Sequence, residues 1–139
     1  AVAERLRALA PHAPQLQVTV TPAPPERLDG GSAPAAWTGL TVWGITGIAR
    51  PERMRALLER SGARGAGWSA FRDHHSLSAA ELAAATRAAA QSNAVPVTTG
   101  KDAARLALRG AMPEGWMVLR IRVDVTGGWE ALVESVTSP

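Results

Sequence analysis

The sequence predicts an α/β fold: an αβα layered domain with a mostly parallel sheet, plus a two-stranded β linker. Between Leu40 and Val125, short apolar runs alternate with helical patterns, which is typical of βαβ units. The 139 residues include 46% hydrophobic and 19% charged residues, the composition of a folded chain with its own core. Segments 17–22 and 117–125 alternate apolar and polar residues, and we expect them to pair as the linker.

Residues 1–36 are predicted to contain a helix, a strand and a long connection. The helix is expected over "AVAERLRALA" (1–10), because its apolar residues recur at helical spacing and Pro11 stops it. "LQVTVT" (16–21) has the alternation of a half-buried strand. "PAPPERLDGGSAPAA" (22–36) collects prolines and glycines, so it is predicted to be a linker.

Residues 37–116 are predicted to form the α/β domain itself. The apolar runs predict strands at 40–46, 65–71 and 94–99, and the helical patterns predict helices at 50–62, 78–92 and 101–110. Pro51 suits a first helical position, and Ser78 with Glu81 forms a capping box. Gly110 is expected to end the third helix.

Residues 117–139 are predicted to hold the second linker strand and a last helix. "MVLRIRVDV" alternates strictly and suits a strand with one wet face, its apolar side formed by Met117, Leu119, Ile121, Val123 and Val125. "GWEALVESV" (128–136) is expected to be the helix.

Composition excludes several classes of protein. The chain has no cysteine, so it has no disulfides and no thiolate metal site. The net charge of +3 comes from scattered basic residues, which gives no sign of a nucleic-acid partner. No apolar run approaches the roughly 18 residues of a membrane span, and no secretory signal opens the chain. Because Ala1 is not a methionine, we expect a fragment or a processed product.

Three loops are predicted to meet at one edge of the sheet. "TGIARPE" (46–52), "RDHHSLS" (72–78) and "TTGKD" (98–102) each follow a predicted strand and precede a predicted helix. In parallel α/β sheets, ligands bind outside the carboxyl ends of the strands. The candidate site is therefore expected in these loops.

Asp73, His74 and His75 form the most polar group in these loops. A histidine can take a proton near neutral pH, and a neighbouring carboxylate can orient it. The alternative is a solvated turn whose polar groups satisfy the start of a helix. A metal site is disfavoured, because zinc or manganese takes three or four ligands and the three loops otherwise offer only Glu52 and Asp102.

Two further loops carry cations. Lys101 opens a predicted helix and could meet a phosphate there, or else Thr99 or Gly100 simply caps that helix while Asp102 complements its dipole. Arg50 precedes a Pro-initiated helix and suits an anion, although such a junction also serves packing.

The sequence contains no G-x-x-x-x-G-K-[ST] or G-x-G-x-x-G motif. If it handles nucleotide, we expect help from residues not present here.

Four segments taken together resemble a known family. "GITGIARPERMRALLERSG", "FRDHHSLSAAEL", "VPVTTGKDAARL" and "WMVLRIRVDV" are similar, in order and spacing, to the C-terminal half of tetraacyldisaccharide 4'-kinase, the lipid A kinase of Gram-negative bacteria. The resemblance implies transfer of the ATP γ-phosphate, with Mg²⁺, to the 4'-hydroxyl of a tetraacyldisaccharide 1-phosphate. It also implies a location at the cytoplasmic face of the bacterial inner membrane, and a second α/β domain joined to a P-loop-like half by a two-stranded β linker.

The resemblance also implies roles for individual residues. His74 would act near the attacking hydroxyl, together with an aspartate from the nucleotide-binding half, and Asp73 would orient it. His75 falls where the family is looser. Lys101 and Asp102 match the end of a Thr-Glu-Lys-Asp stretch typical of the family, with Gly100 in place of the glutamate. ATP and Mg²⁺ would be held mainly by the absent half, so this chain alone is expected to be inactive.

Two rival functions remain open on sequence alone. The triplet Asp73–His75 is shared with metal-dependent DHH-type phosphoesterases, which need further Asp-rich motifs that this chain lacks. A non-catalytic lipid- or nucleotide-binding module is the other rival, which Gly100 in place of the family glutamate and the missing ATP half keep open.

Overall fold

The computed structural model describes residues 2–48, 50–72 and 75–137. The chain divides into two compact units. One unit comprises residues 22–121, and the other combines residues 1–21 with residues 122–139.

The larger unit contains a five-stranded sheet in the order β2-β6-β5-β3-β4. Four strands are mutually parallel: β3 (Thr41–Thr46), β4 (Arg64–Ala70), β5 (Val95–Thr99) and β6 (Met117–Leu119). Three helices connect them: α2 (Pro51–Arg60), α3 (Ala79–Gln91) and α4 (Gly100–Leu108). The short strand β2 (Glu26–Arg27), inside the predicted linker, pairs antiparallel with β6 at the edge. The predicted α/β fold with a mostly parallel sheet is confirmed.

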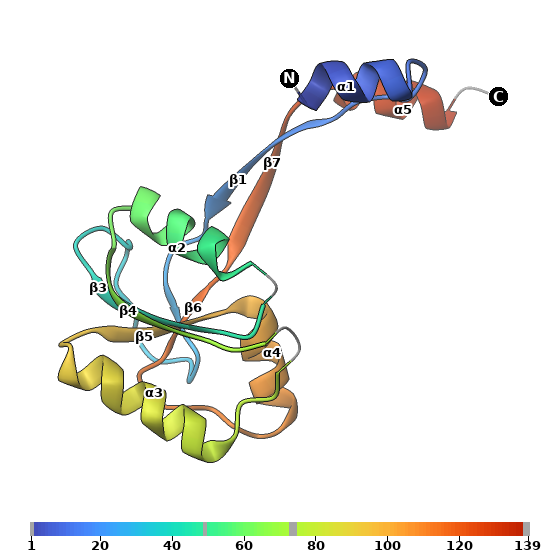
Figure 1. The fold of residues 1–139 in the computed structure, drawn as a ribbon. Coiled ribbons are helices and arrows are strands. Elements are labelled where there is room, and N and C mark those ends of the chain that lie inside the picture. The colour runs from blue at the N-terminus through green and yellow to red at the C-terminus, as the bar shows by residue number, and fades with distance from the viewer. Residues whose placement is uncertain (1, 49, 73–74, 138–139) are drawn as a thin grey trace. The chain divides into compact units, whose positions relative to one another are not determined.

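Helices cover both faces of this sheet (Figure 1). On one face, Met54 of α2 packs in a hydrophobic cluster with Val42 of β3. On the other face, Ala85 of α3 and Leu106 of α4 share a cluster with Ile45 of β3. Because side chains alternate along a strand, one continuous apolar run in β3 serves both cores.

Tryptophan and glycine side by side shape the β3–β4 pair. A Cβ atom on Gly44 would lie 2.0 Å from the ring of Trp68, and a Cβ atom on Gly67 would lie 2.2 Å from the ring of Trp43. The Trp43 ring nitrogen donates a hydrogen bond to Ser69 Oγ at 3.0 Å. Gly44 and Gly67 therefore each leave room for an indole ring from the neighbouring strand.

The predicted strand at 117–125 is wrong in one respect, because the chain divides it in two. Residues Met117–Leu119 are β6, and Ile121–Gly127 are β7. Val118 is only 2% exposed, as buried as its two neighbours, so the expected wet face does not exist in β6. Its position between β5 and β2, in a sheet with helices on both faces, requires apolar side chains on each side.

The smaller unit contains α1 (Val2–Leu9), β1 (Gln17–Pro22), β7 and α5 (Trp129–Thr137). β1 and β7 form a two-stranded antiparallel sheet, as predicted for the linker. Neither α1 nor α5 has a buried residue. Across the described part of the chain, every helix is too short or too polar to cross a membrane.

Candidate functional site

The carboxyl ends of β3, β4 and β5 lie along one edge of the sheet, because the three strands are adjacent and parallel. From β3 the chain passes through α2 to β4, and from β5 it passes through α4 to β6 on the other side. The strand order therefore reverses between β3 and β5. Such a topological switch point is where ligands bind in open α/β sheets.

Asp102 is the centre of a buried hydrogen-bond network at this switch point. Its side chain is 4% exposed, although it lies in the first turn of α4. One carboxylate oxygen, Oδ2, accepts bonds from Thr46 Oγ1 at 3.0 Å, from the Gly47 amide at 3.1 Å and from Thr99 Oγ1 at 2.9 Å. The other oxygen accepts a bond from Arg105 at 3.2 Å. The carboxylate thus fastens the end of β3 to the start of α4.

Thr99 also caps α4, as the sequence allowed. Its hydroxyl accepts a bond from the Asp102 amide at 3.2 Å, which satisfies one of the free amides at a helix start. The same hydroxyl donates to the Asp102 carboxylate. The Thr99 hydroxyl and the Asp102 side chain therefore hold each other in place.

Gly47 links this network to the loop after β4. A Cβ atom at Gly47 would lie 3.4 Å from the backbone oxygens of both Arg72 and His75. The His75 amide in turn donates to the Arg72 carbonyl at 3.0 Å. Upstream, the Phe71 amide donates to the Thr46 carbonyl at 2.9 Å. The β3 and β4 loops therefore touch at the backbone level.

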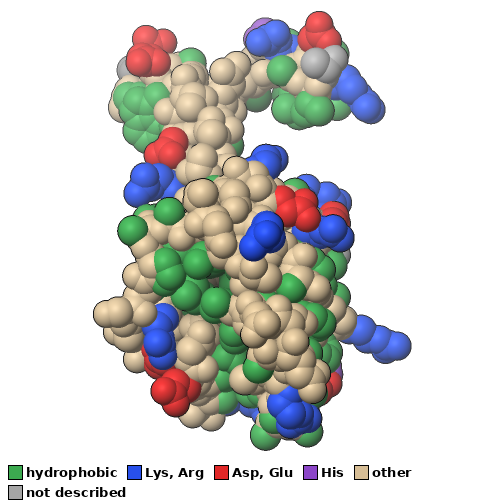
Figure 2. All heavy atoms as spheres, turned by 90° about the vertical axis from the view of Figure 1, so that its left-hand side faces the viewer, with side chains coloured by type: hydrophobic (Ala, Val, Ile, Leu, Met, Phe, Trp, Pro, Cys, Tyr) green, Lys and Arg blue, Asp and Glu red, His purple; other side chains and the backbone are tan. Residues whose placement is uncertain are grey.

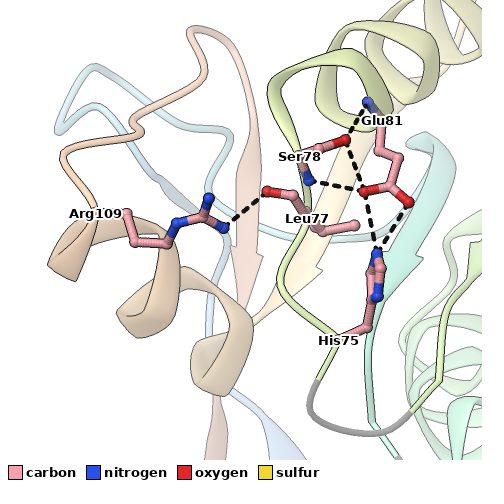
Figure 3. Close-up of polar contacts among 5 residues, drawn as sticks. All are labelled: His75, Leu77, Ser78, Glu81 and Arg109. Carbon is pink, nitrogen blue, oxygen red and sulfur yellow. Dashed lines mark hydrogen bonds and ion pairs between the residues drawn. The ribbon is translucent and has the colours of Figure 1, made fainter.

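The His75 side chain is held on two sides, by Glu81 (Figure 3) and by Phe71. Its Nε2 atom lies 2.9 Å and 3.1 Å from the two carboxylate oxygens of Glu81. Its ring stacks on Phe71 with the ring centroids 5.1 Å apart and the planes 7° from parallel. A carboxylate can only accept, so Nε2 is the donor and carries a proton in this arrangement.

Glu81 has a second task at the start of α3. Its carboxylate accepts bonds from the Ser78 amide at 2.7 Å and the Ser78 hydroxyl at 2.9 Å, and its amide donates to that hydroxyl. The predicted capping box is confirmed. The Ser78 amide, the Ser78 hydroxyl and, more weakly, His75 lower the pKa of Glu81, although desolvation opposes them. Glu81 is therefore a carboxylate at neutral pH.

The end of the same loop is fixed by α4. Arg109 donates to the Leu77 carbonyl at 3.0 Å, and the Leu77 side chain is buried. His75, Leu77, Asp102 and Arg105 are among the residues that line a small recess here. The loop after β4 thus packs against α4 and its C-terminal end, and the loop after β3 is bonded to the start of α4 through Asp102.

The predicted site residues are distributed as follows. Asp73 and His74, the two residues with the predicted catalytic role, lie outside the described residues. Arg50 precedes α2 as an exposed residue without a side-chain capping bond, and Lys101 is exposed in the first turn of α4. Asp102 is instead buried among protein donors.

Sequence reasoning missed the partners of two of these residues. The sequence around Asp102 does not indicate that Thr46 and Gly47 are its hydrogen-bond partners, because these residues lie more than fifty positions earlier, at the end of β3. The His75–Glu81 contact spans six positions, and the capping box had already marked Glu81. The signal for that pair was therefore present in the sequence.

No metal site stands out in the part of the chain that the structure describes. No group of three or more histidine, aspartate or glutamate side chains is placed to hold an ion there. Asp102 accepts hydrogen bonds from the protein on both oxygens. These described residues do not fit Mg²⁺.

Charged side chains do not gather into one patch on the face drawn in Figure 2. Basic, acidic and apolar side chains are interspersed there.

The fold defines the class: an open-sheet α/β domain with polar loops at its topological switch point, the edge at which ligands generally bind in such sheets. The family described as tetraacyldisaccharide-1-P 4'-kinase matches residues 2–138. The chain belongs to this family. A solved structure, "apo" form LpxK from Aquifex aeolicus in complex with ATP, shares the fold with a TM-score of 0.55 at 16% identity, covering 87% of this chain and 34% of that one.

Curated relatives agree with the family match. The tetraacyldisaccharide 4'-kinase of Anaeromyxobacter sp. (strain Fw109-5) is 38% identical over 138 residues, which cover 96% of this chain and 37% of the relative. That of Anaeromyxobacter dehalogenans (strain 2CP-C) is 40% identical over 137 residues, covering 93% and 36%. The chain therefore spans little more than a third of the length of these relatives.

Proposed function

We propose that this chain forms the acceptor side of a lipid A 4'-kinase. The reaction is transfer of the ATP γ-phosphate to the 4'-hydroxyl of a tetraacyldisaccharide 1-phosphate. The observation that carries the proposal is the family match over residues 2–138. The position of the three loops at a topological switch point supports it.

His74 is the proposed proton acceptor, and Asp73 orients it. As the 4'-hydroxyl oxygen attacks the γ-phosphorus, the bond from that phosphorus to the β,γ-bridging oxygen breaks, and the hydroxyl proton passes to His74. Such transfers depend mainly on positioning and charge stabilisation. What supports these roles is the flanking backbone, since Arg72 and His75 are bonded to each other and packed against Gly47 at the switch point.

Lys101 and Arg50 are proposed to bind phosphate groups. Both are exposed cations that follow neighbouring parallel strands, β5 and β3, so both lie at the edge where the acceptor would bind. His75 and Asp102 support the loops rather than the phosphate. Their side chains are occupied by Glu81 and by donors of the protein, respectively.

ATP and Mg²⁺ are proposed to bind mainly to the nucleotide-binding portion found in complete members of the family. The ATP complex of the Aquifex aeolicus protein and the 37% coverage of the first relative support this assignment. Exposed apolar residues on α1 and α5, including Leu6, Leu9, Trp129 and Val133, offer a surface for that portion. By this proposal the 139-residue chain is inactive alone, and the complete enzyme works peripherally at the cytoplasmic face of the inner membrane.

A grafted kinase tests the proposal. In it, this chain replaces the matching 138-residue segment of the Anaeromyxobacter sp. (strain Fw109-5) kinase. We expect ATP-dependent 4'-phosphorylation of a tetraacyldisaccharide 1-phosphate, measured by transfer of radiolabelled γ-phosphate, and no transfer by the 139-residue chain alone. A folded graft that binds ATP and the lipid without turnover would instead support the alternative of a non-catalytic binding module.

A further inference from the structure

His75 is bonded or stacked against three other residues of the protein. Its Nε2 meets both oxygens of Glu81, its ring stacks on Phe71, and its amide donates to Arg72. These contacts reach the end of β4 on one side and the start of α3 on the other. The side chain therefore ties together the two ends of the loop in which it lies.

We propose that His75 is a positioning residue, whose bond to Glu81 fixes residues 75–78 against the start of α3 for the phosphoryl transfer. This inference rests on the proposed function, because it assigns His75 a role in the same loop as Asp73 and His74. It also gives Glu81 a role beyond capping α3. The carboxylate holds the helix start and the loop in one geometry.

The two side-chain contacts of His75 restrain it in different ways. Stacking on Phe71 restrains the plane of the ring but leaves it able to slide, whereas a charge-assisted hydrogen bond fixes one atom at a set distance. His75 is about a third exposed, with its side chain at 35%, so its contribution to overall folding is modest. Its contribution to geometry can be large, since a shift of about 1 Å in a reacting group can cost about 10²-fold in rate.

Two substitutions separate the hydrogen bond from the ring. His75→Phe keeps an aromatic ring against Phe71 and removes the donor to Glu81. His75→Gln loses the ring, but its amide nitrogen lies near the place of Nε2 and can donate to the same carboxylate. His12→Gln is the matched control, since His12 is an exposed histidine in a turn.

The first measurement uses the 139-residue chain and needs no enzymatic activity. We expect His75→Phe to speed amide hydrogen exchange at residues 75 and 78 at least about tenfold, while core amides such as that of Val97 are unchanged. His75→Gln is expected to stay within about threefold of the parent. Equal protection in all variants at residues 75 and 78 would overturn the positioning role, whatever the activity of the grafted kinase.

The second measurement uses the grafted kinase. His75→Phe is expected to lower kcat about 10- to 100-fold with the KM for ATP unchanged within about twofold, and His75→Gln to recover at least about a third of the parent kcat. In a His74→Ala background, His75→Phe should cost little more, because its effect acts through the placement of His74. A loss that multiplies fully with that of His74→Ala, or a matching rise in KM for ATP, would contradict the inference. An inactive graft with the expected exchange pattern would contradict the proposed function alone.

Discussion

Asp102 shows how a residue that looks like a ligand group from sequence can be a structural one. Its position at the start of α4 suits an anion-binding loop or a helix cap, and both readings concern local sequence. In the structure it is buried and accepts bonds from Thr46, Gly47 and Thr99 on a single oxygen. A carboxylate so occupied orders the loops at the switch point and has little capacity left for a ligand.

Replacing Asp102 by asparagine should destabilise the larger unit. The amide nitrogen that replaces one carboxylate oxygen cannot accept a hydrogen bond, so at least one of the bonds to Asp102 is lost, at a cost of about 1–3 kcal/mol. Urea unfolding followed by tryptophan fluorescence measures the change. Asp124→Asn is the matched control, because Asp124 is exposed on β7, and it should stay within about 0.5 kcal/mol. Equal stabilities for the two variants would refute the buried network.

At the scale of the elements, pattern and end signals predicted most of the fold. Pro51 at the start of α2 and the capping box of α3 lie where the sequence placed them. The division of the segment 117–125 was missed, because residues 119–125 alternate and the prediction extended that alternation back over Val118, an apolar residue where a polar one was expected. Only the neighbouring strands decide that β6 is buried on both faces and that β7 leaves the sheet.

The same limit applied to the candidate site. Local sequence located its loops, since each strand-to-helix junction carries polar residues. It could not find the contacts between loops, because the approach of Gly47 to Arg72 and His75 depends on strand order. Strand order follows from packing of the whole sheet, not from any one segment.

The tryptophan–glycine packing of β3 and β4 makes a sharp prediction for one element. Gly44→Ala places a methyl group where the Trp68 ring lies, and overpacking of this kind costs about 1–3 kcal/mol or more. Gly100→Ala is the matched control, because a Cβ atom there meets nothing closer than 3.6 Å and alanine favours a helix. Thermal melts should show a clearly lower Tm for the first variant and an equal or higher Tm for the second. Unchanged melting of Gly44→Ala would disprove the packing.

At the scale of the whole molecule, the chain combines an α/β unit with a two-stranded sheet and two helices that bury none of their described residues. A unit that leaves Leu9 at 81% exposed and Val136 at 76% exposed is suited to packing against further protein. The family match explains what such protein would be, since the relatives are more than twice as long. Under the proposed function, the larger unit presents the acceptor loops, and the nucleotide-binding portion of a complete family member binds ATP.

The most direct measurement is the turnover of the grafted kinase with His74→Ala. As the proton acceptor for the 4'-hydroxyl, His74 should be worth about 10²–10⁴-fold in kcat, with the KM for ATP nearly unchanged because the nucleotide binds elsewhere. His12→Ala in the same graft controls for loss of a histidine. The proposal predicts a loss of at least about a hundredfold for His74→Ala and none for His12→Ala. A loss well under about tenfold for His74→Ala would contradict the role assigned to this residue.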